Sequence, residues 1–122
     1  MNEQQKKLVN YFDEQIAACK QRSEILAVDD RMDEANIEKV RANIYDIFKT
    51  ILSAAERVCG TDDAAKRHFF LQKAEQIPES RRAAYENAEK HEDAEKMLIE
   101  RTKLDTIQEI QDKFIQVWEE VL

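Results

Sequence analysis

The scarcity of chain-breaking residues is the feature that most constrains the fold of this chain. Its 122 residues contain one glycine, Gly60, and one proline, Pro78. Sheets, barrels and sandwiches need turn residues about every dozen positions, so the sequence argues against a β-rich fold. Hydrophobic residues make up 43% and charged residues 37%, a mixture that is typical of long helices with a solvated side and is too apolar for disorder. We therefore expect an all-α protein, and the length suits a single domain over residues 1–122.

Apolar residues at steps of three and four predict a first helix over about residues 3–28. The series begins at Leu8 and marks one face of an amphipathic helix. The same stripe would next bury Asp30 and Asp33, which is costly, so we expect the helix to stop near residue 29, with Asp30 capping the helix that follows. Because no glycine or proline interrupts this part of the chain, one continuous rod over residues 3–58 is the alternative to a hairpin.

A second helix, about residues 31–59, is predicted to lie at the centre of the bundle. It carries two apolar stripes, one made of Ile37, Val40, Ile44, Ile47, Ile51 and Val58 and the other of Tyr45, Phe48, Leu52, Ala55 and Cys59. A wide apolar face indicates a helix that touches two neighbours. After it, Gly60 suits the left-handed conformation past a helix end, and Thr61 is the expected cap of the next helix.

The rest of the chain predicts a short helix and a long one. The short helix covers about residues 62–76 and is ended by Pro78, which then stands at the first position of a helix over 79–122. Residues 83–94 offer mainly alanine and should pair closely with the short helix, whereas the later apolar residues should pack on the first two helices. A bend near residues 91–96 stays open. The expected fold is a mainly antiparallel bundle of four helices, three long and one short.

The charge balance excludes some classes of partner. Nineteen basic residues stand against 26 acidic ones, a net charge of −7, which repels the phosphate backbone of nucleic acids. The longest stretch without a charged residue is the six residues from Thr50 to Ala55, whereas a membrane helix needs about twenty apolar residues. The first residues are too polar for a secretory signal. We expect a cytoplasmic protein that binds neither nucleic acid nor membrane.

The histidines and cysteines form no catalytic or metal-binding pattern. His91 and Glu95 could share a helix face, but neither His91 nor His68 has the acid three residues earlier that a di-iron bundle requires. In a hairpin fold Cys19 and Cys59 would lie about 27 Å apart, beyond the reach of a disulfide, so both are expected to be free core thiols. We name no catalytic, cofactor-binding or metal-binding residue and expect no cofactor. If the protein were an enzyme, His68, His91 and Glu95 would be the residues to test.

These observations favour a small, acidic, non-catalytic protein–protein interaction or scaffold module. Helices of unequal length would leave apolar surface uncovered, so we expect a homodimer, with or without another protein partner. The alternative is a ligand-binding helical regulator, whose pocket would be lined by His68, Phe69, Phe70 and Tyr85.

Overall fold

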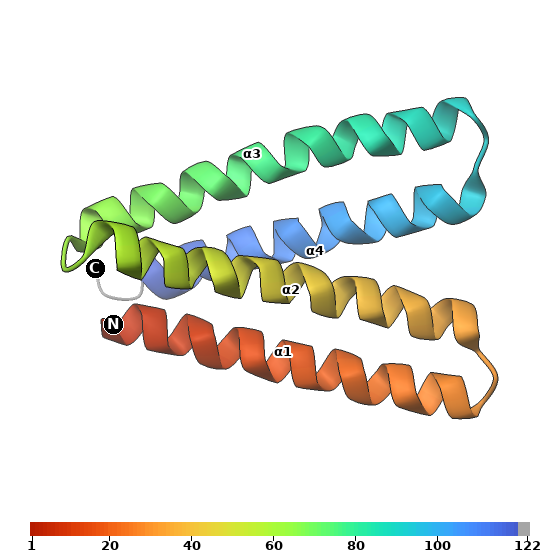
Figure 1. Cartoon of the computed structure of the whole chain (residues 1–122), viewed down its shortest axis with the longest axis horizontal. Helices are drawn as coiled ribbons and strands as arrows, with labels where there is room; N and C mark the ends of the chain where they lie inside the picture. The colour runs from red at the N-terminus through yellow and green to blue at the C-terminus, as the bar shows by residue number, and fades with distance from the viewer. Residues whose placement is uncertain (120–122) are drawn as a thin grey trace.

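Four helices of nearly equal length make up the structure, a computed structural model that describes residues 1–119. They are α1 (Glu3–Val28), α2 (Met32–Cys59), α3 (Asp63–Lys90) and α4 (Ala94–Glu119), and residues 1–119 contain no strand. Successive helices run in opposite directions, so that α1 pairs with α2 and α3 with α4 (Figure 1). The all-α, antiparallel four-helix bundle is thus confirmed. The expected end of the last helix, residues 120–122, lies outside the described residues.

The predicted central position of the second helix is confirmed, because α2 contacts each of the other three helices. Helix α4 also contacts the other three, so the last part of the chain packs on the first two helices as expected. Since α2 and α4 are both even-numbered in an up-and-down bundle, they run parallel and meet across its middle. Helices α1 and α3 lie on the outside, and the two hairpins diverge towards their tips (Figure 1).

A stack of aromatic rings forms the centre of the core. The rings of Phe70 and Phe114 are stacked, with their centres 4.2 Å apart. The ring of Phe48 meets that of Phe70 edge-on, with their centres 5.9 Å apart. Trp118 stacks on Phe114 at 5.1 Å. Burying each of these phenylalanine side chains stabilises the fold by about 1.5–3 kcal/mol, and they join α2, α3 and α4 near the end where α2 connects to α3.

The turn between α1 and α2 settles the choice between hairpin and rod. α1 ends at Val28 and α2 begins at Met32, so the two helices form a hairpin. The backbone N–H of Arg31 donates to the carbonyl of Leu26 (2.8 Å), and Asp30 adopts a φ of 60°. The prediction that Asp30 caps α2 was wrong, because its backbone belongs to the closing turn of α1. The N-cap position is Arg31, which makes no side-chain capping bond.

The connection from α2 to α3 follows the prediction except at the cap. Gly60 has a φ of 61°, a conformation that costs glycine little. The predicted cap, Thr61, was wrong by one residue: the carboxylate of Asp62 accepts a hydrogen bond from the backbone N–H of Ala65 (3.0 Å). A carboxylate also interacts favourably with the positive end of the helix.

Pro78 lies inside α3 and does not end it, so the predicted boundary between residues 76 and 79 was wrong. Proline has no N–H to donate to the carbonyl four residues earlier, that of Ala74. That carbonyl instead accepts a hydrogen bond from the side-chain amide of Gln111 on α4 (2.7 Å). With the freed carbonyl satisfied, α3 continues to Lys90, longer than predicted, and α4 is correspondingly shorter.

The break between α3 and α4 falls within the region where a bend was left open. Glu92 adopts a φ of 54°, and the N–H of Asp93 donates to the carbonyl of Ala88 (3.0 Å). The carboxylate of Asp93 then accepts from the N–H of Lys96 (3.1 Å) and caps α4. The alanine-rich stretch is therefore mostly the last part of α3, so the prediction that it pairs with the short helix was wrong. This part of α3 pairs with α4 instead (Figure 1).

Candidate functional site

The structure does not bring the predicted reactive side chains together. His68, His91 and Glu95 are all exposed, and the two histidines lie 23 positions apart on one helical run, about 34 Å along its axis. The Nδ1 atom of His91 lies 2.8 Å from the carbonyl oxygen of Asn87. Within residues 1–119, no three histidine, cysteine or acidic side chains are grouped as metal ligands would be.

Both cysteines are free thiols in different surroundings. Cys19 is fully buried in the core and Cys59 is half-buried. Burial raises the pKa of the Cys19 thiol, and the guanidinium of Arg22 lies 3.4 Å from its sulfur. The thiolate is the reactive form of cysteine, and a raised pKa keeps the thiol protonated. Cys19 is therefore a small core residue and not a nucleophile.

The pocket predicted for a ligand-binding regulator is not formed. Phe70 is fully buried in the aromatic core, and Phe69 is half-buried beneath the ammonium of Lys73, 5.8 Å from its ring centre. Tyr85 instead lines a separate hollow of about 310 Å³ between α3 and α4. His68 is exposed one turn from the start of α3.

A buried ionic cluster ties three helices together near the α2–α3 connection. The ammonium of Lys66, only 4% exposed, lies 2.8 Å from the carboxylate of Glu56. It also donates to the side-chain carbonyl of Gln5 (3.2 Å), which is fully buried. The Lys66 ammonium lowers the pKa of Glu56 to about 2. Each charge has a partner on another helix, so the cluster holds α1, α2 and α3 in register.

A second polar cluster joins α2 to α4. The hydroxyl of Tyr45 donates to the carboxylate of Glu109 (3.1 Å), and Arg41 lies 3.8 Å from the same carboxylate. Tyr11 of α1 meets Tyr45 edge-on, with ring centres 6.0 Å apart. Burial is the largest cause of a raised pKa at Tyr45. This cluster positions helices, as the first one does, and sequence periodicity gave no signal for either.

Exposed apolar side chains gather where α1 turns into α2. Ile25 is 62% exposed, Val28 90% and Met32 47%. The residues around them are mostly acidic, namely Asp29, Asp30, Asp33 and Glu34. The one basic residue is Arg31, which forms an ion pair with Glu34. We call residues 25–34 the α1–α2 tip. Ile25 and Val28 lie off the periodic stripe of α1, which is the one signal that the sequence carries for their exposure.

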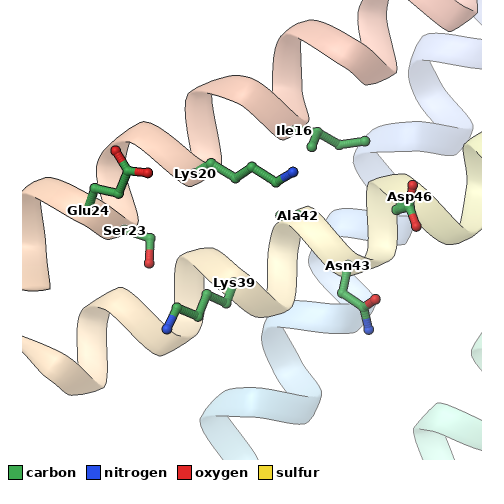
Figure 2. A pocket seen from close by; sticks show the side chains of 8 residues that line it. All are labelled: Ile16, Lys20, Ser23, Glu24, Lys39, Ala42, Asn43 and Asp46. Carbon is green, nitrogen blue, oxygen red and sulfur yellow. The ribbon is translucent and has the colours of Figure 1, made fainter.

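A groove of about 480 Å³ runs along the outer side of the same hairpin. Figure 2 shows the residues that line it, and they are Ile16, Lys20, Ser23 and Glu24 of α1 and Lys39, Ala42, Asn43 and Asp46 of α2. The hydroxyl of Ser23 donates to the carbonyl of Ala35 (3.0 Å) and so links the two walls. We call this the α1–α2 groove. The sequence indicates these residues only as parts of separate helix faces and does not predict a groove between them.

No family model, no curated protein and no solved structure matches this chain. None of the helices within residues 1–119 is both long enough and apolar enough to cross a membrane. Its function must therefore be inferred from its own surface.

Proposed function

We propose that this protein is a non-catalytic interaction module that binds another protein through the α1–α2 tip. The observation that carries the proposal is the exposure of Ile25, Val28 and Met32 together at the end of one hairpin. Burying apolar surface is favourable by about 25 cal/mol for each Å², and contiguous exposed apolar patches on soluble proteins mark interaction sites. Nothing in the bundle requires Val28 to be apolar, since it is almost fully exposed.

The charges around the tip define the chemistry of the partner. Residues 29–34 carry four acidic side chains and one basic one, and the whole chain has a net charge of −7. An acidic protein would be repelled from this end, whereas a hollow with an apolar floor and a rim of lysine or arginine would be complementary. The same acidity disfavours nucleic acid. The proposal includes a cytoplasmic location, which composition favours, and self-association as a homodimer, and it needs no cofactor.

The hairpin beneath the tip is well suited to present a rigid surface. Arg22 of α1 forms an ion pair with Glu38 of α2 (3.1 Å), and the hydroxyl of Ser23 bonds to the carbonyl of Ala35 (3.0 Å). The residues of both contacts lie within four residues of the tip, about one helical turn. A surface that is already ordered loses little conformational entropy on binding, which favours affinity.

Site-specific crosslinking tests this function. A photo-crosslinking amino acid is placed at Val28 in one variant and at Glu75, an exposed position on α3, in a control variant. In lysate of the native host, we expect one basic protein to crosslink at residue 28 and none at residue 75. The double substitution Val28→Glu, Met32→Glu should abolish that complex while circular dichroism and the melting temperature stay unchanged.

Two results would overturn the proposal. The first is a partner that binds the double variant as tightly as the wild-type chain. The second is crosslinking that is equal at residues 28 and 75, because this would indicate non-specific contact.

A further inference from the structure

A hollow of about 310 Å³ lies between α3 and α4, on the hairpin that does not carry the tip. We call it the α3–α4 hollow. Its floor is apolar, because Pro78 is buried, Ile107 is 1% exposed and Leu104 is half-buried beside them. The side chains at its border are polar or charged, and they are Arg82, Tyr85, Arg101, Asp105, Gln108 and Gln111.

The two arginines of the hollow come from different helices and lie at nearly the same level. The hydrogen bond from the Gln111 amide to the carbonyl of Ala74 (2.7 Å) and the turn at residues 91–93 fix the register of α3 against α4. This register sets Arg101 level with residues 83–84, which is about 3 Å or less along the axis from Arg82. Two guanidinium groups therefore border one hollow, one from each helix.

The positive charge of these arginines is only partly compensated. The side chain of Arg82 forms no ion pair or hydrogen bond within residues 1–119. Arg101 lies 3.5 Å from the carboxylate of Asp105, but both side chains are mostly exposed, and such surface pairs contribute little to stability. Two arginines against one aspartate leave the border of the hollow at +1 on a chain whose net charge is −7. The hollow is thus a locally positive place on a negative molecule, which attracts anions.

The donors and the floor define the chemistry of the ligand. A guanidinium presents a planar fork of N–H groups that matches the oxygens of a carboxylate or a phosphate. The hydroxyl of Tyr85, a half-buried residue, has no hydrogen-bond partner in the part of the chain that the structure describes, so it is free to donate as well. A few polar groups around an apolar floor are typical of small-molecule sites, and a volume of 310 Å³ stands at the lower end of their range.

We propose that the α3–α4 hollow binds a small organic anion, whose carboxylate or phosphate group is held between Arg82 and Arg101 and whose apolar body lies on Pro78 and Ile107. The inference goes beyond the proposed function and does not rest on it, because the tip belongs to the other hairpin. The Gln111–Ala74 hydrogen bond joins the two walls before any ligand arrives, and a site that is already formed binds at a lower cost in conformational entropy.

An NMR titration of the isotope-labelled full chain tests the site. The probes are phenyl phosphate and benzoate, with phenol as a ring without the anion and inorganic phosphate as an anion without the ring. We expect at least one of the two aromatic anions to shift the backbone amide signals of Arg82, Tyr85 and Arg101 with a dissociation constant of about 1 mM or below. The tighter of the two identifies the anionic group.

Three results of this titration would overturn the inference. The first is the lack of a saturable shift at these residues up to about 10 mM of either aromatic anion. The second is an equal response to phenol, and the third is equally tight binding of inorganic phosphate, which would indicate an adventitious ion only. If the site fails in one of these ways while the chain still crosslinks its partner at residue 28, the proposed function survives.

Removal of either guanidinium tests the location. Arg82→Gln and Arg101→Gln should each raise the dissociation constant of the tighter probe at least about tenfold, because each removes a charge-assisted hydrogen-bond donor. Both side chains are exposed, so the melting temperature should stay unchanged. Arg57→Gln, the same change at an exposed arginine of α2, is the matched control and should leave the constant within about twofold. An equal effect of the three substitutions would overturn the inference, since it would reflect net charge alone.

Removal of the competing carboxylate should have the opposite effect. In the free protein Asp105 pairs with Arg101, so the ligand must displace it. Asp105→Asn should therefore lower the dissociation constant about threefold or more. Asp33→Asn, the same change at an exposed aspartate of the tip, should alter it less than about twofold. Equal effects of these two substitutions would show that the anion does not lie against Arg101, and the proposed site would be wrong.

Discussion

Replacing Gln111 by alanine should destabilise the bundle through the backbone of another helix. Pro78 cannot donate to the carbonyl of Ala74, and Ala74 is 1% exposed, so water does not take the place of the missing donor. The amide of Gln111 fills that role at 2.7 Å. Without it the carbonyl is buried and unpaired, which costs about 1–3 kcal/mol of the free energy of unfolding.

This cost corresponds to a readily measured shift. With an unfolding entropy of about 2.1 cal/mol/K per residue, a chain of 122 residues loses about 4 °C in Tm for each kcal/mol. Gln111→Ala should therefore lower the Tm by about 4–12 °C in a thermal melt followed by circular dichroism. Gln108→Ala is the matched control: its amide donates to Asp112 at the exposed surface (3.0 Å), and its loss should cost less than about 0.5 kcal/mol.

A double-mutant cycle with Pro78→Ala separates this mechanism from loss of packing. Alanine at position 78 restores a backbone N–H to the carbonyl of Ala74, so that carbonyl no longer depends on Gln111. The cost of Gln111→Ala should then fall by about 1 kcal/mol or more relative to its cost beside proline. An equal cost in the two backgrounds would show that Gln111 acts by packing, and would refute the reasoning.

The structure leads to three other measurable expectations. Glu92→Gly should raise stability by about 0.5–1 kcal/mol, because Glu92, in the turn between α3 and α4, has a positive φ (54°) that glycine adopts without strain. Glu89→Gly, in the last turn of α3, should instead lower stability by about 1 kcal/mol, and a reversed order of the two melting temperatures would contradict this. The pKa of Glu56 is lowered to about 2 in the folded state, so its ionised form stabilises the fold fully above about pH 4.5 and less as the pH falls towards 2. In urea unfolding, the free energy of unfolding of the wild-type chain should exceed that of Glu56→Gln at neutral pH, and the difference should vanish at about pH 2. A difference that persists at about pH 2 would be inconsistent with the lowered pKa. Residues 79–105 include only two buried residues, so this part of the α3–α4 hairpin should open more easily than the core. Its backbone amides should exchange hydrogen faster than those of residues 44–52, and equal protection of the two stretches would contradict this.

Apolar periodicity was sufficient to predict the main architecture. The stripe that begins at Leu8 and stops before Asp30 correctly placed the end of α1, and the double stripe of residues 31–59 correctly made α2 a helix that contacts all three others. These predictions succeeded because burial of one helix face is a local property of the sequence.

The boundary between α3 and α4 could not be found in the same way. The turn there is closed by Glu92, a residue type without turn preference, and the helix tolerates Pro78 because of Gln111, 33 positions further on. The first depends on a local backbone conformation that the residue type does not indicate, and the second on a contact between two helices. The surface features were missed for a related reason: the charges of the groove lie on two helices, and only the register of α1 against α2 brings Lys39 level with Lys20. The sequence shows those side chains only as separate solvated positions.

The parallel meeting of α2 and α4 has a consequence for how the chain reaches this structure. Each hairpin is closed by contacts between neighbours in sequence, whereas the hydrogen bond from Tyr45 to Glu109 spans 64 residues. Local contacts form fastest and distant ones limit the rate of folding. The connection at residues 60–62 holds the hairpins at a high effective concentration, which favours their pairing within one chain. We expect two quickly formed hairpins whose docking is the slow step.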